Sequence, residues 1–401
     1  MLKTQNFQNL TGNEYLAADI ACKHDKAFEK EHWDVRIQHF RDLISSDNLS
    51  DETKKASNPI GMRAALNAWN QTAEGKESGY MISLDASSSG LQLLALLMSC
   101  PTSWKLCGGD ENILDAYVEI FKQMDIGTGL ERADIKQCIM TALYGSEAMP
   151  KAIFKDDVNI FYEVMEQMTP GAWELNLGLQ DLWDEVNGNT YDWEMPDNFY
   201  CCIETQDSEI INFNFLDEKY QVVQKFDGRP RFHKGLAPNA IHSVDGMIVR
   251  EMLRRCMFDP KVTTRVIGLI MKDDKTEPTG KSAEMVKILW DHYKESGFLS
   301  VRILDYLYED TIGLVDKLTI AELIQSMPNA PFDVITVHDC FRCHPNYGND
   351  LRRQYNTIMA DINDSNMLAY IATQIVGRKV IATKSGSIPR EVILNGNYLL
   401  G

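Results

Sequence analysis

Apolar and polar positions follow helical spacing through most of the first seventy residues. Residues 13 to 45 alternate apolar and charged positions at this spacing, whereas residues 46 to 60 are polar and rich in residues that cap helices. Helical spacing returns from residue 62 to residue 70. We therefore expect a helical N-terminal region that is interrupted by a loop at residues 46 to 60.

Two short apolar runs are each followed closely by an aspartate. Tyr80–Leu84 precedes Asp85, and a small-residue turn then leads into the apolar segment 91–98, which predicts a strand, a turn and a helix. Phe332–Val337 predicts a buried strand with Asp339 just past its end. Both aspartates are thus expected at the ends of strands.

Segments 111–125 and 131–155 predict two helices, separated by a break at Gly127 and Gly129. Residues 200 to 223 alternate like a β-hairpin or meander.

Helical spacing returns from residue 349 to residue 377. Strands and helices do not alternate regularly along the chain, which favours an α+β fold over a doubly wound sheet.

Size and composition narrow the class of protein. A chain of 401 residues can bury a large core and divide into two or three lobes. No apolar stretch reaches the roughly 18 residues of a membrane span, and the first residues lack the apolar core of a signal peptide. We therefore expect a cytoplasmic protein without a membrane partner.

The formal net charge of −18 argues against tight, independent binding of nucleic acid, which relies on basic groups. A cleft with locally concentrated basic groups remains compatible with this charge. If the protein acts on nucleic acid, the charge predicts dependence on a partner.

Two short motifs are discounted. Residues 340–344 spell C-x-x-C-H, the haem-attachment pattern of exported proteins, but nine scattered cysteines in a long chain favour reduced thiols. Residues 280–282 resemble the end of a phosphate loop, yet Lys275 occupies the position of the required glycine.

The two strand-end aspartates, Asp85 and Asp339, suit a site for two Mg²⁺ ions. Mg²⁺ prefers oxygen ligands and is often held by one or two carboxylates together with substrate phosphates. Two such ions are what nucleotidyl transfer requires.

Four residues of the second predicted helix lie at four-residue spacing, namely Arg132, Lys136, Met140 and Tyr144. Each step advances the helix face by about 400°, so the four form one slowly winding stripe. The basic residues would meet a triphosphate. Without other evidence, the stripe is better explained as solvated charges beside a helix face that packs on the core. Together with the aspartate pair, a triphosphate-binding stripe becomes the better explanation.

Five segments resemble, in order, blocks of the single-subunit RNA polymerases of bacteriophages and mitochondria. Residues 85–92 resemble motif A, residues 131–146 motif B, and His338-Asp339 motif C. Residues 235–246 resemble the segment with the ribose-sensing histidine, and residues 193–199 resemble the strand that enters the promoter-reading hairpin.

The resemblance implies a right-hand polymerase fold with palm and fingers. The palm would comprise residues 1–110 and 242–401, with a helical insertion at about 255–330 and a C-terminal foot, and the fingers residues 111–241, with a specificity hairpin at about 200–234. The family's N-terminal promoter domain and thumb are expected to be lacking. The insertion is interpreted as surface decoration in preference to a partner-docking element.

The resemblance also assigns roles to the metal and phosphate ligands. Asp85 and Asp339 would hold the two Mg²⁺ ions with help from the Ala86 carbonyl. Arg132 and Lys136 would grip the triphosphate.

Further roles follow for residues around these ligands. Tyr144 would guard the insertion site, His242 would contact the ribose 2′-hydroxyl, Lys26 would be a second phosphate contact, and Tyr117 would lie on the template side. Without the resemblance, His242 would more often be a structural histidine, and Lys26 would more often be a surface charge. Tyr117 would be a core residue as often as a functional one. His338 would orient backbone or primer.

Three positions separate an RNA polymerase from DNA polymerases of the related right-handed family. Gly90 stands where those enzymes place a bulky Glu that excludes the 2′-hydroxyl, Cys340 where they carry Glu, and Met140 where they carry an aromatic residue. We therefore expect a DNA-directed RNA polymerase that uses NTPs, a DNA template and an RNA primer end. The alternatives are such a DNA polymerase and a non-catalytic polymerase-like scaffold.

In this family, the thumb and upstream segments precede motif A by more than the 84 residues found here. The resemblance is therefore closest to the large catalytic subunit of a split, heterodimeric phage RNA polymerase. A smaller subunit would supply the thumb and upstream segment, and a separate promoter-loading or single-stranded-DNA-binding protein would open the promoter.

Overall fold

The computed structural model describes most of the chain, namely residues 2, 5–107, 114–125, 129–216, 218–231, 233–272 and 280–401. Helix accounts for 59% and strand for 11% of the residues, which confirms the α+β class. Among the helices described, none combines the length and apolar character that a bilayer span requires. All nine cysteines are free thiols, as expected.

The N-terminal region is helical and consists of α1 (Gly12–His24), η1 (Lys26–Lys30), α2 (Trp33–Ile44), α3 (Leu49–Lys55) and α4 (Pro59–Ala73). The prediction of a loop at residues 46 to 60 is wrong, because α3 and the start of α4 lie there. Its capping residues begin helices: the Asn58 side chain accepts from the N–H of Gly61 at 2.9 Å, with Pro59 in the first turn.

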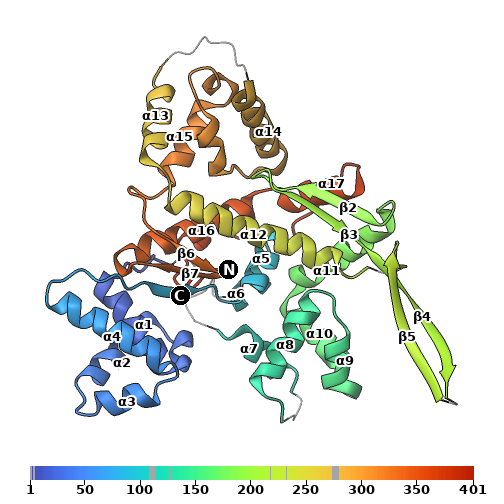
Figure 1. Cartoon of the computed structure of the whole chain (residues 1–401), viewed down its shortest axis with the longest axis horizontal. Helices are drawn as coiled ribbons and strands as arrows, with labels where there is room; N and C mark the ends of the chain where they lie inside the picture. Colours follow the sequence, from blue (N-terminus) through green and yellow to red (C-terminus); the bar gives the residue numbers. More distant parts are fainter. Residues whose placement is uncertain are drawn as a thin grey trace.

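A small antiparallel sheet of order β1-β7-β6 lies at the centre of the molecule (Figure 1) and is formed by β1 (Ile82–Asp85), β6 (Ile335–Val337) and β7 (Cys340–Cys343). The helices beside it, α5 (Ser89–Leu97), α12 (Leu236–Cys256) and α16 (Gly348–Asp364), pack against one another.

The strand expected at residues 332 to 337 is shorter and less buried than predicted. Only residues 335–337 form β6, an edge strand in which Ile335 is 51% and Val337 48% exposed. The buried members of this apolar run, Phe332 and Val334, precede the strand.

The middle of the chain is a helical layer of α6 (Pro101–Leu106), α7 (Ala116–Gln123), α8 (Arg132–Leu143), α9 (Ala148–Phe154), η2 (Lys155–Asp157), α10 (Val158–Met168), α11 (Pro170–Asp181) and η3 (Leu182–Glu185). The single helix expected at 131–155 divides into α8 and α9, because the chain turns at Gly145 with a φ of +84°. Gly129 lies outside helix, as expected, whereas Gly127 and residues 111–113 lie outside the described residues.

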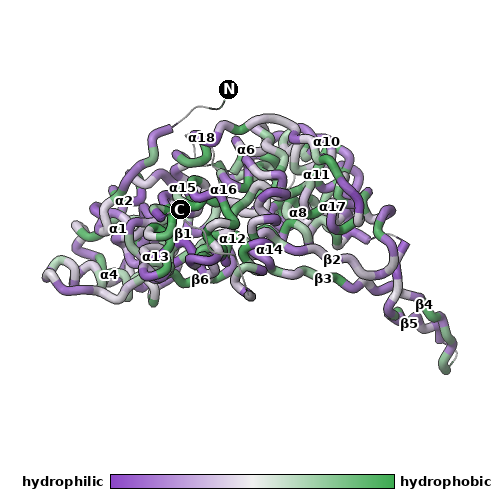
Figure 2. The backbone as a smooth tube through the Cα atoms, turned by 90° about the horizontal axis from the view of Figure 1, so that it is seen from above, coloured by the Kyte–Doolittle hydropathy of each residue, from purple (hydrophilic) through white to green (hydrophobic). Residues whose placement is uncertain are grey.

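Two hairpins follow. β2 (Thr190–Glu194) pairs with β3 (Tyr200–Glu204), and β4 (Gln206–Phe215) pairs with β5 (Glu218–Asp227) over ten residue pairs. The hairpin expected within residues 200 to 223 is therefore confirmed. Figures 1 and 2 show the β4–β5 ribbon extending away from the body of the molecule.

The chain then forms α13 (Pro260–Ile270), α14 (Gly280–Ser296), η4 (Val301–Tyr306), η5 (Ile312–Leu314) and α15 (Lys317–Gln325). These elements enclose a hydrophobic cluster of their own, at the top of Figure 1, and we call its buried residues, from Val266 to Met327, the second core. The main core joins the N-terminal helices, the sheet and the helical layer.

The last elements are η6 (Pro345–Tyr347), α16, α17 (Met367–Val376) and α18 (Arg390–Leu394). The helix expected at 349–377 is interrupted at Ser365, whose hydroxyl accepts from the N–H of Met367 at 3.2 Å and so begins α17.

Candidate functional site

Asp85 and Asp339, far apart in sequence, become neighbours through strand pairing. In β1, Ile82 and Leu84 are buried and the alternation leaves Asp85 exposed. Asp85 pairs with Cys340, the first residue of β7, and Asp339 lies in the tight turn before it. The N–H of Ala86 donates to the Asp339 carbonyl at 3.2 Å. The sheet register therefore brings the two predicted metal ligands together.

The C-terminal tail holds the backbone around Asp85. The N–H of Gly401 donates to the Asp85 carbonyl at 2.9 Å, and the N–H of Ser87 donates to the Leu399 carbonyl at 3.1 Å. Neither of these two hydrogen bonds uses the carbonyl of Ala86, which is a predicted metal ligand. The resemblance predicted a C-terminal foot, but no local sequence pattern predicted which residues it contacts.

Helix α8 turns its polar stripe toward the same region. Its buried face comprises Ile135, Cys138, Ile139, Ala142 and Leu143, so Arg132, Lys136 and Met140 remain exposed. The ammonium of Lys136 lies 5.7 Å from the ring centroid of Tyr117. Arg132 is ion-paired with Asp115 at 2.5 Å, and Asp115 also caps α7.

Tyr144, at the end of α8, meets two other predicted residues. A Cβ atom at Gly90 would lie 2.5 Å from the Tyr144 hydroxyl oxygen, so only glycine leaves this approach free. The rings of Tyr144 and His242 meet edge to face, with centroids 5.3 Å apart. Burial, followed by the negative charge of Asp245, raises the pKa of Tyr144 to about 12. Tyr144 is thus neutral at physiological pH and available as a hydrogen-bond donor.

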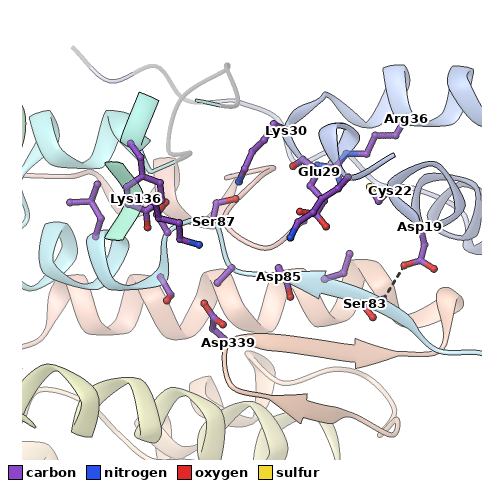
Figure 3. Close-up of a pocket in the computed structure, with 18 of the residues that line it drawn as sticks. Asp19, Cys22, Glu29, Lys30, Arg36, Ser83, Asp85, Ser87, Lys136 and Asp339 are labelled. Atoms are coloured by element: carbon purple, nitrogen blue, oxygen red, sulfur yellow. Dashed lines mark hydrogen bonds between the residues drawn. The ribbon is translucent and has the colours of Figure 1, made fainter. Parts of the chain in front are cut away.

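Nine of the ten predicted site residues line one pocket of about 570 Å³, namely Lys26, Asp85, Ala86, Gly90, Tyr117, Arg132, Lys136, Tyr144 and Asp339. The tenth, His242, lies beside Tyr144. Figure 3 shows Asp85 on its strand and Asp339 at the turn between two strands, with the Lys136 side chain across from them. The structure thus brings nine of these residues together in one pocket, while their functional roles stay predictions.

The donor set in the pocket fits Mg²⁺. Asp85, Asp339 and the Ala86 carbonyl offer only oxygen atoms, the ligands that this ion prefers. Within the described ranges, no group of three or more His, Cys, Asp or Glu side chains could hold a metal. Two carboxylates therefore need substrate phosphates and waters to complete the coordination, which matches the expectation for a site loaded together with a nucleotide.

Sequence reasoning missed Asp245, one helical turn after His242. Burial, and after it the charge of Asp339, raises the pKa of Asp245. A pattern could have found it, because residues three apart on a helix share a face.

Sequence reasoning also missed Lys30 and Arg36, which line the wall of the pocket opposite α8. Isolated basic residues on a helical segment carry no signal that separates them from surface charge. Lys26, predicted from the resemblance, lies on the same wall.

No protein-family model matches this sequence, and a comparison with curated proteins gives no significant match. The functional argument therefore rests on the motifs and on the geometry of the pocket.

Proposed function

We propose that this chain is the catalytic subunit of a DNA-directed RNA polymerase with a right-hand fold. The sheet β1-β7-β6 with α5, α12 and α16 would form the palm, and the helical layer from α7 onward with the β2–β5 hairpins would form the fingers. One observation carries the proposal: residues from three separated motifs line one pocket, which combines the carboxylates of Asp85 and Asp339 with several cations.

In the proposed reaction, the RNA 3′-hydroxyl attacks the α-phosphate of an NTP. Asp85, Asp339 and the Ala86 carbonyl would hold two Mg²⁺ ions, which supply activation of the hydroxyl and neutralisation of the leaving pyrophosphate. Lys136 and Arg132 stabilise the negative charge that moves onto the pyrophosphate. Arg132 exchanges its Asp115 partner for phosphate oxygens when the substrate binds.

The sugar end of the pocket favours ribonucleotides over the DNA polymerase alternative. Gly90 leaves open the space that a bulky side chain would fill, and it does so directly against the Tyr144 hydroxyl. The neutral phenol of Tyr144 and the adjacent imidazole of His242 can hydrogen-bond a 2′-hydroxyl.

The β4–β5 ribbon is the proposed specificity hairpin. Alternation along the ribbon puts polar side chains on one face, namely Ser208, Asn212, Asn214, Lys219, Gln221 and Lys225, with the Ile210–Val223 pair among them. Phe213 and Tyr220 stack on the other face. Amides and lysines on an exposed ribbon can contact base edges and phosphates in a major groove, which supports a role in reading the promoter.

Partners complete the proposal. The net charge of −18 opposes independent binding of duplex DNA, whose phosphates are also negatively charged. A smaller subunit would supply the thumb and upstream segment of a heterodimer, and a separate loading or single-stranded-DNA-binding protein would deliver the promoter.

Extension of an RNA primer on a DNA template, with the chain and its smaller subunit, tests the proposal. We expect magnesium-dependent extension with NTPs and poor use of dNTPs. Tyr144→Phe removes the phenolic hydroxyl and should reduce the preference for NTPs over dNTPs about two- to tenfold, which corresponds to the free energy of one hydrogen bond. The exposed Tyr308→Phe is the matched control and should change nothing.

Two other outcomes would redirect the assignment. Equal use of NTPs and dNTPs by the wild type would favour the DNA polymerase alternative. Failure to bind Mg²⁺ and NTP even with the partner present would favour the scaffold alternative.

A further inference from the structure

The pocket has two cationic walls, and on the second wall the resemblance assigns a role to Lys26 alone. Helix α8 contributes Arg132 and Lys136, whereas η1 contributes Lys26 and Lys30 at its two ends. Figure 3 shows the Lys30 side chain reaching into the pocket from the wall opposite Lys136.

The backbone on both sides of Lys30 is held by a buried arginine. Arg36 donates to the Glu29 carbonyl at 3.0 Å and to the Glu31 carbonyl at 2.9 Å. Its guanidinium stacks on the Trp33 ring, 4.4 Å from the centroid, and its side chain is 3% exposed. Lys30 therefore starts from a fixed backbone position, which is how binding residues are preorganised.

The ion pairing of Lys30 differs from that of Arg132. Arg132 is paired with Asp115, but no carboxylate forms an ion pair with Lys30 in the part of the chain that the structure describes. Partial removal from water lowers the pKa of Lys30 and outweighs the charge of Asp115, although the side chain keeps an exposed surface. An incoming anion would relieve this unfavourable state.

Position along α8 indicates which part of a nucleotide Lys30 would meet. Tyr144 and Gly90 mark the sugar end, and Arg132 begins the helix twelve residues earlier, about 18 Å away along the axis. The charges of Asp115 and Arg132 act on the pKa of Lys30. Lys30 therefore lies toward the end of the pocket at which Arg132 begins α8. A triphosphate that extends from the sugar end toward Arg132 would bring its terminal phosphate to Lys30.

We propose that Lys30 binds the terminal phosphate of the nucleoside triphosphate, across the pocket from Arg132. This assignment rests on the proposed polymerase function and deepens it, because it adds an η1 contact that distinguishes a triphosphate from shorter phosphate tails.

Calorimetric titration of the chain with ATP, ADP and AMP in the presence of magnesium tests the assignment. Lys30→Met should weaken ATP binding about tenfold, the worth of one charge-assisted contact, and should change ADP and AMP binding less than twofold. Lys30→Arg should restore most of the ATP affinity. Lys54→Met, on the exposed face of α3, is the matched control and should bind all three nucleotides like the wild type.

Kinetics and folding separate binding from a structural role. In primer extension, Lys30→Met should raise KM for NTP about tenfold, change kcat less than threefold, and leave the thermal unfolding midpoint unchanged. Unchanged ATP affinity in Lys30→Met, equal weakening for all three nucleotides, or a lowered unfolding midpoint would each overturn the assignment.

The outcomes also separate the two proposals. If Lys136→Met weakens ATP binding and Lys30→Met does not, the Lys30 assignment alone fails. If the wild-type chain neither binds ATP nor extends a primer with its partner, the polymerase function fails as well.

Discussion

The main core and the second core differ in what they support. The main core carries the small sheet, α8 and the pocket, so every predicted site residue stands on it or beside it. The second core, from Val266 to Met327, lies within the predicted insertion and encloses none of the site residues. We therefore expect that the stability of the second core can change without altering the pocket.

A buried polar joint connects the two regions. Glu251 on α12, fully buried, accepts from the hydroxyl of Ser300 and from the N–H of Val301, the first residue of η4. Asp197, in the turn between β2 and β3, is held by Arg250 and Arg254, and Arg302 donates to its carbonyl. The joint thus ties α12, the β2–β3 turn and the second core together.

Breaking this joint should have the largest effect on stability. Glu251→Ala would remove one of the two carboxylates that pair with the fully buried Arg255, the other being Asp361, and would remove the acceptor of the Ser300 hydroxyl. We expect a loss of about 3–5 kcal/mol in the free energy of unfolding, measured by urea denaturation, as for other broken buried pairs. The exposed Glu322→Ala, on α15, is the control and should change little. A loss below about 1 kcal/mol for Glu251→Ala would show that the two regions are not joined here.

A cavity in the second core should cost somewhat less and should spare the pocket. Ile303 is fully buried in η4, and Ile303→Ala should lower the free energy of unfolding by about 3 kcal/mol. Ile267→Ala, at a half-exposed position on α13, serves as the control. The folded Ile303→Ala protein should keep its KM for NTP, whereas a KM raised more than threefold would contradict the separation of the two regions.

Low pH should lower the free energy of unfolding through this joint, and by less than Glu251→Ala or Ile303→Ala does. Burial alone would raise the pKa of Asp197, but hydrogen bonds from Arg250 and Arg254 outweigh burial and lower it. A carboxylate with a lowered folded-state pKa adds stability above its unfolded pKa of about 3.9, and that stability disappears as pH falls through the folded value.

We therefore expect Asp197→Asn to lose stability less steeply than the wild type as the pH is lowered below about 4, in urea denaturation at several pH values. Parallel curves for the two proteins would contradict the lowered pKa. Asp207→Asn, on the exposed ribbon, should follow the wild type.

The sequence predicted those parts of the site that local patterns encode. An apolar run before Asp85, an aspartate just after a strand, and four-residue spacing from Arg132 to Tyr144 each have a local cause. The pairing of Gly401 with Asp85 joins the end of the chain to its first strand, and no local pattern specifies such a register. The proposed role of Lys30 could not be predicted, because it depends on the hydrogen bonds from Arg36 to the backbone beside Lys30 and on the facing wall of α8.

Errors in the fold have the same origin. The polar segment at residues 46 to 60 was expected to be a loop because capping residues also favour turns, yet burial of Thr53 and partial burial of Leu49 stabilise α3. The apolar residues Ile335 and Val337 suggested burial, but the end of the sheet leaves them exposed.

The central claim is that Asp85 and Asp339 form a metal site for nucleotidyl transfer, and single-turnover primer extension by the heterodimer tests it most directly. Asp85→Asn and Asp339→Asn should each lower the rate about a thousandfold or more, because each removes a charge that would hold Mg²⁺. The exposed Asp47→Asn is the control and should extend at the wild-type rate. Retention of the wild-type rate by either Asp85→Asn or Asp339→Asn would contradict the account.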